Sequence, residues 1–273
     1  MTINCKGTLV DLSSPKVMGI LNITPDSFYD GGKYKNESEI LHQTEKMLTE
    51  GATFIDVGAY SSRPGAAHIS EDEELNRILP VIDLLIKEFP EILISVDTFR
   101  AKIASETVQR GASIINDISG GNMDEKMFST ISNLNVPYIV MHMLGTPQNM
   151  QKNPVYNNVT QEVISFFAEK IFQLHQLKVN DIIIDVGFGF GKTITHNFEL
   201  LQNLSLFKSL DAPILAGVSR KSMLYKTLDT SAKEALNATT SANTIALLNG
   251  ANILRVHDVK EAVEAVKIVE QVL

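Results

Sequence analysis

Short apolar segments that end in polar, chemically useful residues recur about eight times along this chain, with amphipathic stretches between them. Apolar runs of this length are typical of strands that are buried on both faces. Their alternation with helical stretches predicts a parallel sheet. We expect strands near residues 17–22, 53–57, 92–97, 112–117, 137–141, 182–186, 213–218 and 252–256.

The length of the chain indicates how these strands close. A (β/α)8 barrel typically needs about 250 residues, and this chain has 273. No Pro/Gly/Ser-rich linker divides the alternation. We therefore predict an α/β fold, a (β/α)8 TIM barrel that forms a single domain over residues 1–273. Residues 1–15, with alternating apolar positions, predict a short N-terminal hairpin that caps the bottom of the barrel.

Charge and cysteine usage limit the partners and the compartment. The net charge of −8 disfavours a nucleic-acid partner but allows small anionic substrates. Cys5 is the single cysteine, so we expect no intramolecular disulfide and a reducing, cytoplasmic location. We expect neither a secretory signal nor a membrane span, because no apolar stretch approaches the necessary length.

Polar residues at the ends of the predicted strands meet on one rim of a parallel barrel. Asp97, Asn116 and Asp185 each end an apolar run. They form either a buried structural network or a cradle of hydrogen-bond acceptors for a ligand with several N–H donors. Lys221 balances their charge and donates a hydrogen bond to such a ligand.

Cationic residues share the same rim. Arg63 follows the second strand, and Arg255 and His257 lie at the end of the eighth. Arg63 is either an isolated surface charge or, together with Arg255 and His257, part of a phosphate or diphosphate site. The segment 219–222 adds positive charge at the start of a helix, where free N–H groups suit an anion. Asn22 opens a loop with two acidic residues, which is either a surface turn or a mobile loop beside a cationic or metal-bound centre.

The glycine-rich segment 187–193 follows the sixth strand but fits neither phosphate-loop nor dinucleotide spacing. We expect its glycines to let the backbone approach a flat ligand, with Phe188 or Phe190 as an apolar wall. No HExxH zinc motif and no Gly-x-Ser-x-Gly motif occurs in the sequence.

Together these stretches resemble the dihydropteroate synthase family, and the resemblance spans nearly the whole barrel in family order. The segments that carry it are Met18-Gly-Ile-Leu-Asn-Ile-Thr-Pro-Asp-Ser-Phe28 with Asp30-Gly-Gly, Ser62-Arg-Pro-Gly65, Ser95-Val-Asp-Thr98, Ile115-Asn-Asp117, Met141-His-Met143, Asp185-Val-Gly-Phe-Gly-Phe-Gly-Lys192, Ser219-Arg-Lys-Ser222 and Arg255-Val-His-Asp258.

The resemblance implies an enzyme that condenses 6-hydroxymethyl-7,8-dihydropterin diphosphate with 4-aminobenzoate, giving 7,8-dihydropteroate and diphosphate for folate synthesis. It also implies bound Mg²⁺, a target of the sulfonamide class and a homodimer. Diphosphate leaves first, and the arylamine then attacks a pterin-methyl cation that Asp30 stabilises. By resemblance the catalytic residues are Asp30, Arg63, Lys221, Arg255 and His257.

The same resemblance assigns the binding residues. Those for pterin are Asp97, Asn116, Met141, Asp185, Lys221 and Arg255. Those for 4-aminobenzoate are Phe28, Ser62, Arg63, Pro64, Phe190, Lys221 and Ser222. Those for diphosphate are Asn22, Arg63, Arg255 and His257, with Asn22 also holding Mg²⁺.

One loop departs from the family pattern, which more often has Gly-Gly-Glu-Ser-Thr where this chain has residues 58–62, Gly-Ala-Tyr-Ser-Ser. Two other interpretations remain. A pterin-binding methyltransferase would not need the cations of the rim. A catalytically silent pterin-binding protein would be expected to lose loop residues that this chain keeps, namely Asp30, Ser62 and Arg63.

Overall fold

The computed structural model describes residues 1–23, 33–61 and 68–272, with the backbone alone for 33–36. Its eight parallel strands form a closed barrel in the order β10-β3-β4-β5-β6-β7-β8-β9, which confirms the predicted TIM barrel. The strands are β3 (Lys16–Asn22), β4 (Phe54–Gly58), β5 (Ile94–Asp97), β6 (Ile114–Asp117), β7 (Tyr138–Met141), β8 (Ile182–Asp185), β9 (Ile214–Ala216) and β10 (Ile253–Val256).

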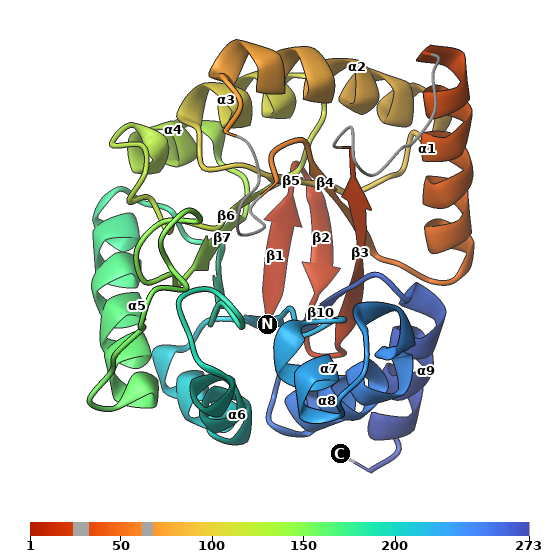
Figure 1. Ribbon diagram of the computed structural model, residues 1–273. Coiled ribbons are helices and arrows are strands. Elements are labelled where there is room, and N and C mark those ends of the chain that lie inside the picture. The colour runs from red at the N-terminus through yellow and green to blue at the C-terminus, as the bar shows by residue number, and fades with distance from the viewer. Residues whose placement is uncertain (24–32, 62–67, 273) are drawn as a thin grey trace.

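Helices surround the barrel as an outer ring (Figure 1). Outward side chains of the strands, such as Val57, Ile115 and Ile184, are fully buried in the apolar layer between the strands and this ring. The helices are α1 (Lys33–Thr49), α2 (Glu71–Glu88), α3 (Ala101–Gln109), α4 (Met127–Leu134), α5 (Val159–Gln176), α6 (Ile194–Gln202), η2 (Leu204–Leu210), α7 (Ser222–Thr227), η3 (Ala232–Glu234), α8 (Leu236–Leu248) and α9 (Val259–Val269).

The predicted N-terminal hairpin is present as β1 (Thr2–Cys5) paired antiparallel with β2 (Thr8–Asp11). One face of it contributes Ile3, Cys5, Val10 and Leu12 to a cluster with inward side chains of the barrel. Because this end of the barrel is filled by apolar side chains, polar chemistry is left to the opposite end. No helix in the described part of the chain is long and apolar enough to cross a membrane.

Candidate active site

The side chains inside the barrel lie in layers, because successive residues of a strand point to opposite faces. The lowest layer packs on the hairpin and is apolar. Its members are Met18, Phe54, Leu93, Ile114, Ile139, Ile183, Leu215 and Ile253. Residues two and four positions further along each strand therefore also face the interior, and they build the site.

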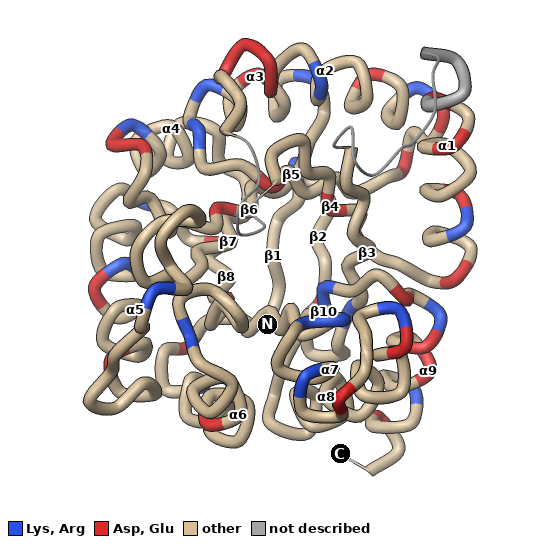
Figure 2. The backbone as a smooth tube through the Cα atoms, in the orientation of Figure 1, with Lys and Arg blue, Asp and Glu red and all other residues tan. Residues whose placement is uncertain are grey.

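The second inward layer is largely polar, and the third lies at the mouth of the barrel. Figure 2 shows acidic positions near β4 and β6 and basic positions near β10. The second layer consists of Ile20, Asp56, Ser95, Asn116, Met141, Asp185, Gly217 and Arg255. The third consists of Asn22, Gly58, Asp97, Ile118, Met143, Gly187, Ser219 and His257.

A charged network joins β4, β5, β6 and β10 across these two layers. Arg255 donates from Nε to Asp56 Oδ2 at 2.6 Å and from Nη2 to Asp97 Oδ2 at 3.0 Å. Asn116 Nδ2 donates to the same Asp56 oxygen at 3.2 Å. Burial works against the charged guanidinium, but Asp56 and Asp97 outweigh it and raise the pKa of Arg255.

The pKa of the Asp97 carboxyl group is strongly shifted. Its pKa is raised to about 7, chiefly because burial disfavours the carboxylate, while Arg255 acts in the opposite direction. Shifts of this kind concentrate at functional sites. The carboxyl group therefore exchanges a proton near neutral pH while facing the barrel mouth.

Asp185 and Lys221 are two further buried groups of opposite charge, and each shifts the pKa of the other. Burial raises the pKa of Asp185, and Lys221 partly offsets this. Burial also lowers the pKa of Lys221 to about 8, against the attraction of Asp185. Gly217 leaves a space between them: a Cβ there would lie 3.9 Å from Asp185 Oδ2, from Lys221 Nζ and from Arg255 Cβ. A side chain at position 217 would occupy this space.

The glycine-rich turn after β8 is fixed by a buried lysine. Lys192 Nζ lies 2.9 Å from His142 Nδ1 and donates to the carbonyl oxygens of Gly187 and Phe190, both at 3.0 Å. This glycine-rich turn also supports Lys221. The Lys221 ammonium donates to the Phe188 carbonyl and lies 4.8 Å from the centre of the Phe190 ring.

Close packing accounts for two glycines of this turn, and the expectation that the turn approaches a ligand stays a prediction. Gly187 and Gly191 have φ of +68° and +63°, and a Cβ on either would collide with the backbone of residues 142–144. Close packing between the connections after β7 and β8 is therefore what requires glycine. Phe188 is fully buried in the outer core, so of the two candidates only Phe190 lies beside the site.

Ser219 controls the orientation of the His257 ring. Its hydroxyl accepts the His257 backbone N–H at 3.2 Å and lies 3.1 Å from Nδ1. Either the hydroxyl donates to Nδ1 or the protonated Nδ1 donates to the hydroxyl, according to the tautomer of the ring. The sequence suggested that Arg220 adds positive charge to the rim. In the structure Asp258 neutralises that charge by accepting two hydrogen bonds of 2.8 Å from Arg220.

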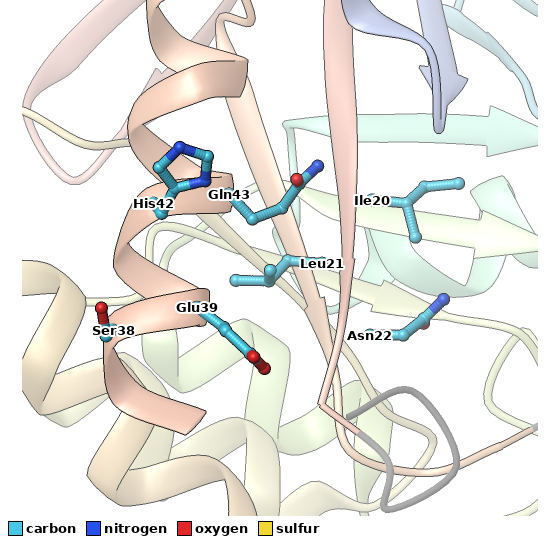
Figure 3. A pocket seen from close by; sticks show the side chains of 7 residues that line it. All are labelled: Ile20, Leu21, Asn22, Ser38, Glu39, His42 and Gln43. Atoms are coloured by element: carbon cyan, nitrogen blue, oxygen red, sulfur yellow. The ribbon is translucent and has the colours of Figure 1, made fainter. Parts of the chain in front are cut away.

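Asn22 lies at the third layer beside β4. A Cβ on Gly58 would be 3.6 Å from Asn22 Oδ1 and 3.8 Å from Asp97 Oδ2, so these oxygens flank the same bare position. Figure 3 shows Ile20 and Asn22 on the side of β3 away from α1, with Leu21 toward the helix. The hollow that it draws, lined also by Ser38, Glu39, His42 and Gln43, lies mostly outside the barrel and is not the site.

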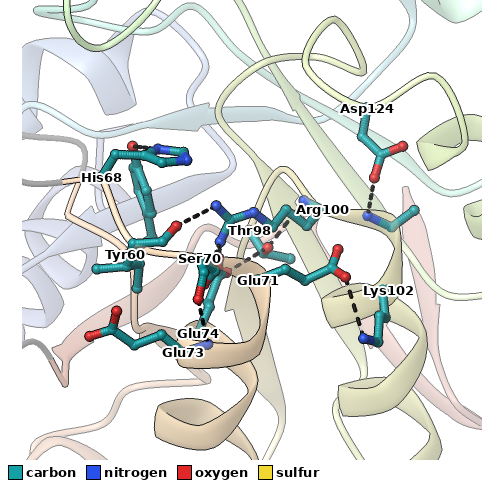
Figure 4. Close-up of polar contacts among 12 residues, drawn as sticks. Tyr60, His68, Ser70, Glu71, Glu73, Glu74, Thr98, Arg100, Lys102 and Asp124 are labelled. Atoms are coloured by element: carbon teal, nitrogen blue, oxygen red, sulfur yellow. Dashed lines mark hydrogen bonds and ion pairs between the residues drawn. The ribbon is translucent and has the colours of Figure 1, made fainter.

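The loop that departs from the family pattern is anchored by aromatic contacts. Tyr60 packs edge-on against Phe99, with ring centres 5.0 Å apart, and its hydroxyl lies 3.2 Å from His68 Nδ1. Arg100 lies over both rings, pairs with buried Glu74 and donates to the Ile69 carbonyl at 2.6 Å (Figure 4). The Tyr60 ring thus lies between an aromatic ring and a guanidinium, with its hydroxyl against a histidine.

Comparison with known proteins gives the same assignment over the whole barrel. The model of the pterin binding enzyme family matches residues 18–257. The dihydropteroate synthase of Escherichia coli K12 is 42% identical, over 100% of this chain and 97% of its own length. That of Bacillus subtilis is 40% identical, over 94% and 88%.

The chain belongs to the dihydropteroate synthase family. It is therefore a transferase of folate biosynthesis. Among solved structures, the Yersinia pestis dihydropteroate synthase with a sulfonamide drug has a TM-score of 0.93 and 41% identity, over 100% of this chain and 99% of that one. The Xanthomonas albilineans dihydropteroate synthase with 7,8-dihydropteroate has a TM-score of 0.90 and 32% identity, over 100% and 98%.

The structure of this dihydropteroate synthase brings most of the predicted site residues together. Asp97, Asn116, Asp185, Arg255 and their neighbours face one space in the barrel, with Lys221 and Phe190 at its edge. Five predicted residues lie outside the described part of the chain: Phe28, Asp30, Ser62, Arg63 and Pro64. The role of each residue toward a substrate stays a prediction.

Sequence reasoning missed Asp56, Lys192 and Gly217. It examined the ends of the strands, whereas Asp56 lies inside one. A usable signal was present, because Asp56 is a charged residue in the run Phe54–Gly58, whose five residues are all buried. Lys192 was named only as the last residue of the glycine-rich motif. The neighbouring sequence does not indicate that its side chain contacts His142, 50 residues away.

Proposed function

We propose that the chain condenses 6-hydroxymethyl-7,8-dihydropterin diphosphate with 4-aminobenzoate, giving 7,8-dihydropteroate and diphosphate. The observation that carries this substrate assignment is the set of inward acceptors beside one inward lysine, because a pterin ring edge offers several N–H donors. A solved Xanthomonas albilineans relative, 35% identical, holds 4-aminobenzoic acid, and another holds 7,8-dihydropteroate.

The pterin ring lies in the second inward layer in this proposal. Asp97, Asn116 and Asp185 accept from its N–H groups, and Lys221 donates to its carbonyl or ring nitrogen. Met141 and Arg255 pack against its faces. The space left by Gly217 supports this placement, since it is bounded by Asp185, Lys221 and Arg255.

The diphosphate lies above the pterin at the barrel mouth. Arg63, Arg255 and His257 bind its oxygens, and the Ser219 hydroxyl, 3.1 Å from Nδ1, supports the His257 ring. Asn22 would hold Mg²⁺, which would neutralise charge on the leaving group. No three His, Cys, Asp or Glu side chains among the described residues gather to hold a metal. One amide oxygen fits Mg²⁺, since this ion usually takes substrate phosphates and water as its other ligands.

The reaction follows from this arrangement. The C–O bond to diphosphate breaks with its electron pair leaving on the diphosphate oxygen, and donors around that oxygen stabilise the charge. Asp30 stabilises the pterin-methyl cation. The neutral amine of 4-aminobenzoate attacks the cation, the C–N bond forms, and the amine nitrogen loses a proton to water.

The second substrate is held at the rim. Its carboxylate binds Ser222 at the start of α7, and its ring lies among Phe28, Ser62, Arg63, Pro64, Phe190 and Lys221. Contact between the Lys221 ammonium and the Phe190 ring supports this position, because together they offer an apolar face beside a cation.

Incubation with pterin diphosphate, Mg²⁺ and 4-aminobenzoate is expected to give dihydropteroate, detected by mass spectrometry. Chelation of Mg²⁺ is expected to reduce the rate by at least about tenfold, because charge on the leaving group is then less neutralised. A protein that binds pterin tightly without forming product would instead be a silent pterin-binding protein, and the assigned chemistry would be wrong.

Pterin affinity is expected to fall as pH drops below 7. Asp97, whose pKa is raised to about 7, is protonated below that pH, and its neutral carboxyl group is a weaker acceptor for a pterin N–H. Its charged neighbours are Arg255, Asp56, Glu74 and Asp117. Between pH 7.5 and 5.5 the Kd rises by up to about 25-fold, the value reached when only the ionised form of a group with a pKa of about 7 binds pterin. Calorimetry across this range measures it, and an Asp97→Asn variant should lose the dependence.

We also propose a homodimer and a cytoplasmic location. The helix α8 carries no Lys, Arg, Asp or Glu, and it exposes Ile245 and Leu248 beside α9, which exposes Ile268. An apolar patch of this kind suits a second copy of the chain. Sedimentation should give a dimer that Leu248→Asp dissociates.

The buried free thiol of Cys5 supports a reducing compartment, which cell fractionation tests.

A further inference from the structure

Asp56 is a buried charge that the chemistry described above does not use. It lies in the second inward layer with no solvent exposure. Its Oδ2 receives hydrogen bonds from Arg255 and Asn116, which are predicted to touch the pterin. Among the described residues, its Oδ1 and the hydroxyl of Ser95 opposite it on β5 have no hydrogen-bond partner.

The carboxylate restricts how the Asn116 amide is turned. An ionised carboxylate only accepts hydrogen bonds, so Asn116 must direct its NH₂ group toward Asp56. The amide oxygen then points away from Asp56. A pterin N–H needs an acceptor there, whereas the reversed amide would present a second donor and repel it.

The same carboxylate fixes the Arg255 guanidinium. Asp56 takes Nε and Asp97 takes Nη2, so carboxylates on neighbouring strands hold the guanidinium from two sides. A guanidinium held at two positions keeps its plane, which suits stacking on a flat ring. Asp97 alone would leave the group free to turn about a single contact.

We propose that Asp56 is a positioning residue of the pterin site, which orients the Asn116 amide and the Arg255 guanidinium without contacting the reacting atoms. This inference rests on the proposed pterin site. It separates Asp56 from Asp117, a buried aspartate of β6 that caps its own loop through Ser119 and Gly121 and accepts from Tyr138 at 2.6 Å.

Asp56→Asn is the first test, in the full-length protein. The neutral amide can accept or donate, so Asn116 is no longer held in one orientation. We expect KM for pterin diphosphate to rise about tenfold or more, with KM for 4-aminobenzoate changed less than about twofold. The matched control Asp117→Asn is expected to lower stability and leave both KM values unchanged.

A swap of the two side chains tests the orientation itself. In Asp56→Asn/Asn116→Asp the carboxylate moves to position 116, where both of its oxygens accept, so the pocket regains its acceptor. We expect the swap to bind pterin diphosphate at least about fivefold more tightly than Asp56→Asn alone, because the effects of mutations at two residues in contact are not additive. The swap keeps one buried carboxylate, so where the single variant does not fold, the affinity of the swap is compared with that of the wild type, which it is expected to approach.

The pH profile gives a readout that a merely structural role would not move. The charge of Asp56 raises the pKa of Asp97, so its removal is expected to shift the acid limb of pterin binding to lower pH. Unchanged KM for pterin diphosphate in Asp56→Asn, or a swap no better than the single variant, would overturn the proposal. Failure of the wild type to form dihydropteroate would instead overturn the proposed function.

Discussion

Replacing Asp185 by Asn is expected to weaken the binding of pterin diphosphate about 100-fold, or about 2.7 kcal/mol. Asp185 is the buried acceptor opposite the space at Gly217, and hydrogen bonds to a charged group contribute about 1.5–3 kcal/mol each. Its charge also raises the pKa of Lys221, which stands at about 8. The neutral variant therefore loses an acceptor and also the cationic form of a donor. Calorimetry at pH 7.5 measures the Kd.

The stability of this variant separates lost binding from misfolding. Because burial raises the pKa of Asp185, its charged form costs folding energy at neutral pH, so the neutral Asn variant should be at least as stable. Asp181→Asn is the matched control: it lies at the other end of β8, where it accepts the Asn4 N–H at 3.1 Å. Its pterin affinity should equal that of the wild type, and an unchanged Kd in Asp185→Asn would refute the acceptor role.

Replacing Lys192 by Met is expected to lower the free energy of unfolding by about 3 kcal/mol. The ammonium, 3% exposed, satisfies the Gly187 and Phe190 carbonyls and lies against His142. Without it, acceptors that join the connections after β7 and β8 remain buried and unpaired. The melting temperature should fall by roughly 6–12 °C, and KM for 4-aminobenzoate should rise because Phe190 moves. Urea unfolding and steady-state kinetics measure the two effects.

Lys102→Met provides the contrast. Lys102 forms ion pairs with Glu71 at 3.4 Å and Asp72 at 3.5 Å, but its side chain is half exposed. Exposed pairs contribute about 0–1 kcal/mol, so this variant should unfold nearly as the wild type does. If the two lysine variants lost equal stability, burial of Lys192 would not be the cause.

The barrel and the end of it that carries the site were predictable because both depend on local pattern. Each strand, buried on two faces, reads as a short apolar run, and polar residues at the C-terminal ends of parallel strands necessarily share a rim. Asp97, Asn116 and Asp185 could be chosen on that basis alone. The motifs shared with dihydropteroate synthases then supplied the substrates, which no periodicity indicates.

The partners of these residues were not predictable, and Arg220 illustrates why. From the sequence it is one more cation of the rim, but in the fold its charge is neutralised by Asp258, 38 residues away. Phe188 and Phe190 lie two residues apart in the same turn, yet the first lies in the outer core and the second beside Lys221. Beyond the end of a strand, the type of a residue does not determine the direction in which its side chain points.

The amino-acid sequence by itself determined the (β/α)8 architecture, the N-terminal hairpin, the rim that carries the site and the family. Only the tertiary structure decided which side chains share a layer and which are paired: Asp56 with Arg255, 199 residues apart, and Lys192 with His142. The physical reason is that hydrophobic periodicity reports the surroundings of one segment, whereas closure of the barrel sets the stagger between strands. That stagger brings a carboxylate of β4 against a guanidinium of β10.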